Sequence, residues 1–347
     1  KLSKDLETKV SIRHVNFALF NTMNLEGVYI RDQHKNDTLL YAGRLKVNIT
    51  DWFFFKEQAE IKYLGLEDAI VNMHRTDSVW NYEFLIDYFS NPSTGGKKKQ
   101  FALFLDKVDL KNISFKKVDE WRGQDLILHL KELNLTADQI NFQKKQIHVK
   151  DLAIEEPVFS IYDYPALCPK TPKLIAFKNN MDSLQTPFNE DGWDIAVAQL
   201  NITNGAFRSD RKTVRETYDY FDDSHIHFFA INGDFKKVTL NHDTLLADIK
   251  LSTKERSGFT VNALTAQFRM EPGAMIFDKL DIKTPYSHLR RYYAMRYNDF
   301  DDDMNDFINN VKLEGRFYNS NVHTNDIAYF APELKSWNKL IRIDGDV

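Results

Sequence analysis

The stretch Leu105-Asp-Lys-Val-Asp-Leu110-Lys-Asn112 decides the fold, because its pattern recurs along the whole chain. An apolar residue is followed by two others, a second apolar residue, one residue, a third apolar residue and two polar ones. Further strict copies begin at Ala137, Phe235, Phe277 and Ile308, and looser copies begin at Leu25, Ile61, Leu130, Val149, Val197 and Leu246. Chance would give on the order of one or two strict copies. A chain built from one repeated strand unit is expected to bury a continuous apolar surface rather than to form a catalytic pocket.

The spacing inside the pattern departs from a regular strand. The first two apolar residues are three positions apart, whereas side chains of a strand alternate between faces with a period of two. A β-bulge or kink between them would return all three apolar side chains to one face. The sequence therefore predicts an interruption of the strand inside each copy.

Alternation of apolar and polar residues through most of the chain predicts half-buried antiparallel strands and a mainly β fold with a few short helices. The copies recur about 30 to 50 residues apart when neighbouring strands are paired, which is typical of a stacked repeat. The expected organisation is an amino-terminal β module with a short leading helix at 1–95, a second β module at 101–162, an irregular excursion at 163–192, a third β module at 193–285, and a helical stretch plus the start of a following β module at 286–347. We expect the helical stretch near 286–310 and a short helix within 324–336 that is broken at Pro332.

The charge distribution argues against nucleic acid as a partner. The 347 residues include 46 basic and 50 acidic side chains, and the net charge is −4. Binding to phosphates requires a concentrated positive field, which this mixture lacks. The basic run Lys97-Lys-Lys99 follows two glycines and is interpreted as a solvated loop.

Cys168 is the single cysteine, so the chain can form neither an intrachain disulfide nor a cysteine-based zinc site. One thiol fits a reducing cytosol and equally an envelope protein that avoids cysteine. No segment approaches 18 uninterrupted apolar residues, so no transmembrane helix is expected. The chain begins at Lys1 and ends at Val347 as if cut from a longer protein, and any signal peptide or membrane anchor would lie upstream.

Few residues suggest chemistry, and we predict no metal site. His225 and His227 share a strand face, but a third ligand would have to come from Asp222, Asp223 or another strand. The acidic run at 298–306 lacks the glycine and the glutamate of a calcium-binding loop. Glu155 and Glu156 are neighbours on a strand and are expected to face opposite ways, which excludes an acid/base pair.

The chain has no nucleophile elbow, phosphate-binding loop or dinucleotide fingerprint, so we predict no catalytic residues, no cofactor and no enzyme. The cluster Trp52-Phe-Phe-Phe55 is interpreted as a plug at a strand end, with a membrane belt as the alternative. Four tripeptides match a short bacterial O-glycosylation sequon: Asp37-Thr-Leu39, Asp77-Ser-Val79, Asp182-Ser-Leu184 and Asp243-Thr-Leu245.

Several phrases carry a family resemblance: Leu39-Leu-Tyr-Ala-Gly-Arg-Leu-Lys-Val-Asn-Ile49, Trp52-Phe-Phe-Phe55, Gly65-Leu-Glu-Asp68, Asp77-Ser-Val-Trp-Asn81, Ser320-Asn-Val-His-Thr-Asn-Asp-Ile-Ala-Tyr-Phe-Ala-Pro-Glu-Leu334 and Ile341-Arg-Ile-Asp-Gly345. With them the chain resembles the TamB-like proteins (translocation and assembly module) of the AsmA-like family of Gram-negative envelopes. The resemblance covers most of the chain and rests on the repeated strand pattern and on these short segments.

The resemblance implies a periplasmic segment of a protein tethered to the inner membrane through an anchor outside this chain. It implies an elongated, twisted antiparallel sheet that forms an open trough, a β-taco-like repeat with an apolar inner face. Such a trough would conduct phospholipid acyl chains between the inner and outer membranes without catalysis. The family is also linked to outer-membrane protein assembly, through a missing carboxy-terminal domain that would contact an outer-membrane β-barrel.

Groove-facing apolar residues are the candidate site, because acyl chains would cover them. The predicted lipid-groove residues are Leu25, Val28, Ile30, Leu64, Leu66, Val108, Leu110, Leu152 and Ile154. Periodicity alone favours a different arrangement, in which the apolar faces pack on each other as a dry sandwich or solenoid core.

Two further function classes stay open. A β-solenoid adhesin or scaffold would bind protein or glycan on its outer face and expose aromatic residues such as Tyr218, Tyr220 and Phe221. An enzyme on a β-solenoid would need convergent carboxylates, Arg or His on one outer face, and no spacing in the sequence provides them.

Overall fold

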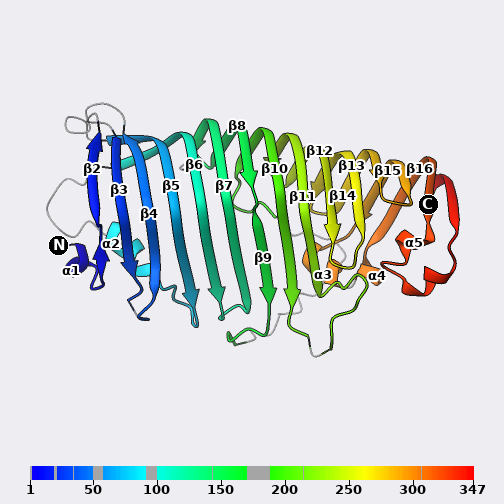
Figure 1. Cartoon of the computed structure of the whole chain (residues 1–347), viewed down its shortest axis with the longest axis horizontal. Coiled ribbons are helices and arrows are strands. Elements are labelled where there is room, and N and C mark those ends of the chain that lie inside the picture. Colours follow the sequence, from blue (N-terminus) through cyan, green and yellow to red (C-terminus); the bar gives the residue numbers. More distant parts are fainter. Residues whose placement is uncertain are drawn as a thin grey trace, which may run out of the picture. The chain divides into compact units, whose positions relative to one another are not determined.

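The computed structural model describes residues 2–18, 22–33, 35–49, 58–90, 100–142, 144–169, 188–213, 215–305 and 307–347 (Figure 1). In these ranges the chain is mainly β with short helices, as predicted, and its strands β1 to β17 belong to a large sheet. The aromatic cluster at 52–55, the basic run at 97–99, the sequon at 182–184 and most of the excursion at 163–192 lie outside the described residues. Contacts divide the chain into two units, and the predicted module boundaries stay a prediction.

Unit 1 comprises residues 1–142, 149–169 and 205–215. Its elements are α1 (Leu2–Asp5), β1 (Val10–Ser11), β2 (His14–Ala18), β3 (Thr22–Arg31), β4 (Thr38–Ile49), β5 (Gln58–Arg75), α2 (Glu83–Ser90), β6 (Gln100–Asp119), β7 (Gln124–Asn141), most of β8 (Gln146–Glu155), β9 (Val158–Asp163) and the end of β10 (Asp194–Arg211). Strands β2 to β5 form an antiparallel meander, and β6 pairs with β7 in the same sense.

Two strand pairs of unit 1 differ from the predicted antiparallel sheet. β5 pairs with β6, and β9 pairs with β10, in parallel. A parallel pair needs a crossover of a dozen or more residues. The chain between β5 and β6, which contains α2, is long enough to be that crossover, whereas a hairpin would have produced the expected antiparallel pair.

Unit 2 comprises residues 143–148, 170–204 and 216–347. Its elements are the start of β10, then β11 (His225–Asn241), β12 (Thr244–Glu255), β13 (Thr260–Glu271), β14 (Ala274–Lys283), β15 (His288–Arg296), α3 (Phe300–Asn305), α4 (Phe307–Asn310), β16 (Lys312–His323), α5 (Thr324–Ile327), the 3-10 helix η1 (Pro332–Ser336) and β17 (Leu340–Asp346). From β11 to β17 each strand pairs antiparallel with the next.

The helical stretch predicted near 286–310 is wrong in its first half. Residues His288–Arg296 form β15, and helix begins only at Phe300. Pairing of β15 with β14 on one side and β16 on the other overrides the local pattern, and adjacent Tyr292 and Tyr293 favour a strand. The break at Pro332 is confirmed, since α5 ends at Ile327 and a separate 3-10 helix begins at Pro332.

The predicted interruption of the strand is found in four strict copies. In each, two exposed residues separate two apolar residues that are buried or half-buried: Leu105 and Val108, Ala137 and Ile140, Phe235 and Val238, Phe277 and Leu280. In the last two copies a left-handed lysine, Lys237 or Lys279, coincides with a register shift of the ladder. Two adjacent residues therefore point to solvent, which is the geometry of a β-bulge.

Two copies do not follow this prediction. The first residues of the copy at Ile308 belong to α4, so that copy is not a strand throughout. The loose copy at Leu246 pairs with β13 in unbroken register, and Leu246 is 42% exposed. Leu246 is exposed where the pattern requires a buried apolar side chain, whereas Ile249 is half-buried.

Unit 2 buries both apolar and polar side chains. Ala274, Ile276, Tyr292 and Ala294 form its buried cluster. The largest fully buried side chains among the described residues are Ile276, Glu255, Thr324 and Asp222. Three of these four are polar, so hydrogen bonds to buried polar groups hold much of unit 2 in place.

Candidate functional site

Apolar side chains of β2 to β7 lie in rows that cross unit 1 perpendicular to the strands. Directly paired residues share a face of the sheet, and their side chains touch. One row joins Val15, Leu25, Leu45, Leu66, Leu110 and Leu133, and the next joins Phe17, Met23, Val47, Leu64, Val108 and Leu135. Candidates distant in sequence, such as Leu25 and Leu110, are thereby brought into one surface.

A line of left-handed residues interrupts these rows. Gly27, Asp68 and Asn112 have φ values of 61°, 52° and 53°. The registers on either side align them across the sheet, and Asn112 Nδ2 donates to Asp68 Oδ1 at 2.6 Å. Gly, Asp and Asn are the residues that tolerate this conformation best.

Apolar rows continue beyond this line. One joins Val28, Ala42, Ala69, Ile113 and Leu130, and another joins Ile30, Leu40, Val71, Phe115, Leu128, Phe159 and Phe207. In β7, Leu130 and Leu133 are both withdrawn from solvent while Lys131 and Asn134 are exposed. In these strands two polar residues, instead of one, separate the apolar residues of the neighbouring rows. Apolar side chains on both sides of the line of left-handed residues therefore lie on the same face of the sheet.

Most predicted groove residues fall in these four rows. Leu152 and Ile154 lie outside the four rows, at alternate positions of β8 in the same unit. Val108 is buried at 9% exposure, whereas the other predicted groove residues are only half-buried. The apolar face therefore keeps hydrocarbon surface in contact with water, which a ligand with apolar chains would remove.

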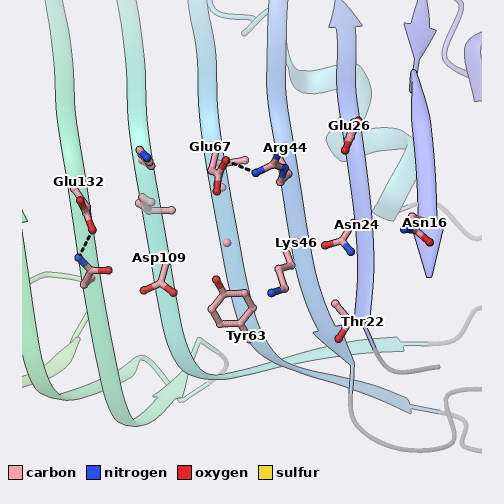
Figure 2. A pocket seen from close by; sticks show the side chains of 15 residues that line it. Asn16, Thr22, Asn24, Glu26, Arg44, Lys46, Tyr63, Glu67, Asp109 and Glu132 are labelled. Atoms are coloured by element: carbon pink, nitrogen blue, oxygen red, sulfur yellow. Dashed lines mark hydrogen bonds and ion pairs between the residues drawn. The ribbon is translucent and has the colours of Figure 1, made fainter. Parts of the chain in front are cut away.

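The opposite face of the same strands carries a polar hollow of about 720 Å³ (Figure 2). A row of alternating charge crosses it: Glu26, Arg44, Glu67, Lys111 and Glu132. Arg44 Nη1 and Glu67 Oε2 are 2.8 Å apart in an exposed ion pair, drawn as a dashed line in Figure 2. Leu66 and Leu110, which belong to an apolar row, also line the hollow beside their polar neighbours in the strands.

Tyr63 is the aromatic residue of this hollow. Its ring lies over Gly65 and between the ammonium groups of Lys46 and Lys107, which are 5.5 and 5.9 Å from its centroid. Burial, followed by a hydrogen bond to Asp109, raises the pKa of Tyr63 to about 12. The phenol therefore stays neutral at physiological pH and acts as a hydrogen-bond donor rather than as a base.

The expectation for Glu155 and Glu156 is wrong. Lys131 Nζ lies 2.6 Å from Glu155 Oε1 and 3.1 Å from Glu156 Oε1, so both carboxylates reach one ammonium. Glu156 has a φ of 48°, which breaks the alternation that would have separated the two side chains. With a lysine between them and high exposure, they form a surface ion triad and have no acid/base arrangement.

The remaining candidates from the sequence can be checked only within the described residues. Among the described residues, no group of three or more His, Cys, Asp and Glu side chains is placed to hold a metal ion. None of the helices in the described part of the chain is both long and apolar enough to cross a membrane. Cys168 is a half-buried free thiol whose backbone amide donates to the Trp121 carbonyl.

A second hollow, of about 520 Å³, lies in unit 2 among loops that the sequence did not single out. Its nearest signal in the sequence was the run of aromatic residues at 218–221. Tyr218 is 41% exposed, but Tyr220 and Phe221 are half-buried, and Phe221 packs against Phe330 at 5.1 Å between ring centroids. The other lining residues come from turns far apart in the sequence, and no spacing links them.

Comparisons with known proteins identify no family. No protein-family model matches the sequence, and no curated protein matches it either. A function for this chain therefore has to be argued from the two faces of unit 1 and the loops of unit 2.

Proposed function

We propose that the apolar face of unit 1 binds phospholipid acyl chains. The chain would act as a non-enzymatic segment of a lipid conduit like that of the TamB/AsmA-like proteins, with the apolar faces of its strands lining an open trough. On the basis of the resemblance, we place it in the periplasm, tethered to the inner membrane through an anchor outside this chain. A link to outer-membrane protein assembly would follow from the same resemblance.

One observation carries the proposal: four aligned apolar rows cross β3 to β7 without a charged residue, and most of their side chains are only half-buried, although Ala42, Val47, Ala69, Val108 and Leu130 are buried. Removing apolar area from water is worth roughly 25 cal/mol per Å², so a hydrocarbon tail laid across the rows would be held without specific hydrogen bonds. Continuity of the rows would let the tail shift from strand to strand.

A matched pair of substitutions in β3 tests the proposal. Leu25→Asp introduces a carboxylate into an apolar row, and Asn24→Asp introduces the same group on the opposite, polar face. We expect Leu25→Asp to weaken binding of fluorescently labelled phospholipid by about tenfold or more, because a carboxylate cannot be desolvated against an acyl chain. Asn24→Asp should leave it unchanged, and native mass spectrometry should find phospholipid on the wild-type protein.

A second pair in β7, Leu135→Asp and Thr136→Asp, repeats the comparison at a distance from β3. Circular dichroism and thermal unfolding identify any variant that fails to fold. Equal binding by the folded members of both pairs, or a wild-type protein that retains no lipid, would rule the proposal out.

A further inference from the structure

The hollow in unit 2 is built by four connections that meet at one place. Its lining includes Asp219 and Tyr220 from the loop after β10, Ser257 from the β12–β13 turn, Tyr286 from the β14–β15 turn, and Asn325, Tyr329, Lys335 and Asn338 from the segment between β16 and β17. A volume of about 520 Å³ falls within the range of roughly 300–1,000 Å³ usual for small-molecule sites. Sites of this kind combine apolar rings with a few fixed polar groups.

Buried polar residues fix the first two connections. Asp222 is 1% exposed and accepts hydrogen bonds from the amides of Tyr218 and Ser224, which sets the loop that carries Asp219 and Tyr220. Glu255, also 1% exposed, accepts from the amide of Ser257 at 2.7 Å. Burying a carboxylate costs free energy unless it is hydrogen-bonded. Here the donors are backbone amides, so the two carboxylates fix the backbone of these connections.

Arg256 joins these two connections to each other. Its guanidinium donates to the carbonyl oxygens of Tyr218 and Tyr220, at 2.9 and 3.0 Å. The rings of the two tyrosines stack at 4.8 Å between centroids and 8° between planes. The aromatic wall of the hollow is thus anchored to the turn that carries Ser257.

Two more buried residues fix the remaining connections. Asp326, 4% exposed, accepts from Thr284 Oγ1 at 2.6 Å and from Ser287 Oγ, which sets the turn that carries Tyr286. Thr324, 0% exposed, pairs with the backbone of Lys339 in both directions beside Asn338. Each of the four buried groups therefore secures a loop of the same hollow before any ligand arrives.

One polar atom of the lining has no hydrogen-bond partner among the described residues. Ser257 Oγ is buried and makes no hydrogen bond with the described residues. Leaving a buried hydroxyl unpaired costs free energy, and a ligand hydroxyl could satisfy it. Gly258 (φ 100°) lies beside it, and a Cβ there would sit 3.3 Å from the ring of Tyr329, so glycine allows that ring to close against the turn.

We propose that this hollow binds a saccharide. Tyr220, Tyr286 and Tyr329 offer rings for the C–H faces of sugar rings, while the amides of Asn325 and Asn338 and the hydroxyl of Ser257 match sugar hydroxyls that both donate and accept. Lys335 and Asp219 balance each other in charge, which does not favour a phosphate. Its charged and amide side chains distinguish this site from the lipid surface proposed for unit 1, whose apolar rows carry no charged residue.

The test uses the 347-residue chain with cellohexaose, chitohexaose and maltohexaose as probes, and with phosphocholine and inorganic phosphate as competing chemistries. Saturation-transfer NMR detects binding, and calorimetry gives the Kd. We expect at least one oligosaccharide to bind and Tyr286→Ala to raise its Kd about tenfold, because that ring lines the hollow and is 52% exposed. Tyr318→Ala removes a ring that is 68% exposed elsewhere in unit 2 and should change nothing.

Ser257→Ala separates a ligand contact from a structural role. The hydroxyl has no partner among the described residues, so its loss should not lower the thermal midpoint but should raise the Kd about fivefold. Free and lipid-linked sugars share this chemistry, and vesicles with and without digalactosyldiacylglycerol distinguish them. The inference is overturned if none of the sugar probes binds, if only phosphocholine or phosphate binds, or if Tyr286→Ala and Ser257→Ala both bind sugar as the wild type does.

Discussion

Asp119→Ala is expected to destabilise unit 1 by about 3–5 kcal/mol, because it leaves a buried guanidinium without its partner. Asp119 is 2% exposed, and Arg75 binds both of its carboxylate oxygens at 2.7 Å. The pair joins the ends of the parallel strands β5 and β6, where Arg75 and Asp119 are in register. Arg75 also stacks on Trp80, 4.5 Å from the ring centroid, so one side chain connects the strand end to the segment that follows it.

Glu67→Ala is the matched control, since it removes the exposed ion pair with Arg44 in the same unit. Pairs of that kind contribute about 1 kcal/mol or less. Urea unfolding followed by circular dichroism measures both variants. Similar losses of stability would show that the Arg75–Asp119 pair is solvated and would contradict the burial in the structure.

The same pair predicts a pH dependence. Burial alone would raise the pKa of Asp119, but hydrogen bonds from the Arg75 guanidinium and the Arg122 amide outweigh it and hold that pKa below its ordinary value. A carboxyl whose pKa is lowered by folding stabilises the protein above its unfolded pKa of about 3.9, and this stabilisation is lost as the pH falls through the folded pKa. The stability difference between wild type and Asp119→Ala should therefore be constant from neutral pH to about pH 5 and shrink below about pH 4.

The repeated strand pattern carried enough information to predict the mainly β fold and the burial of the residues in four of the five strict copies. Leu105, Val108, Ala137 and Ile140 are buried as the pattern requires, because two consecutive polar residues can only be solvated if the strand bends. The sequence alone could not predict which strands pair with each other in the sheet. β15 reads as helix in isolation and becomes a strand only because β14 and β16 flank it.

The two candidate sites also differ in how far the sequence could predict them. Leu25, Leu64 and Leu110 could be predicted to share a face from alternation within their own strands, and the register then aligns them. The hollow of unit 2 could not be predicted, since its residues come from turns whose approach depends on buried groups such as Asp222 and Glu255. Acidic residues in a sequence usually indicate solvent exposure, so their structural role here has no local signal.

Gly123→Ala should cost about 3 kcal/mol or more, because glycine is required at this position for two independent reasons. Gly123 has a φ of 75°, and a Cβ there would lie 2.1 Å from the carbonyl oxygen of Tyr164 and 2.7 Å from the amide nitrogen of Ala166. Backbone atoms cannot move aside as a flexible side chain can. The turn between β6 and β7 would have to separate from residues 164–168, which it holds through three backbone hydrogen bonds donated by Tyr164, Leu167 and Cys168.

Gly192→Ala isolates the first of these reasons, the positive φ. Gly192 has a similar φ of 68°, but a Cβ there would meet no atom within 4 Å, so only backbone strain of about 1 kcal/mol is expected. The difference between the two variants in urea unfolding measures the cost of the clash. Cys168 provides a local readout, because detachment of 164–168 should make this half-buried thiol react faster with a thiol reagent. If both variants lost the same stability and Cys168 kept its wild-type reactivity, the contact between the turn and this segment would not exist in solution.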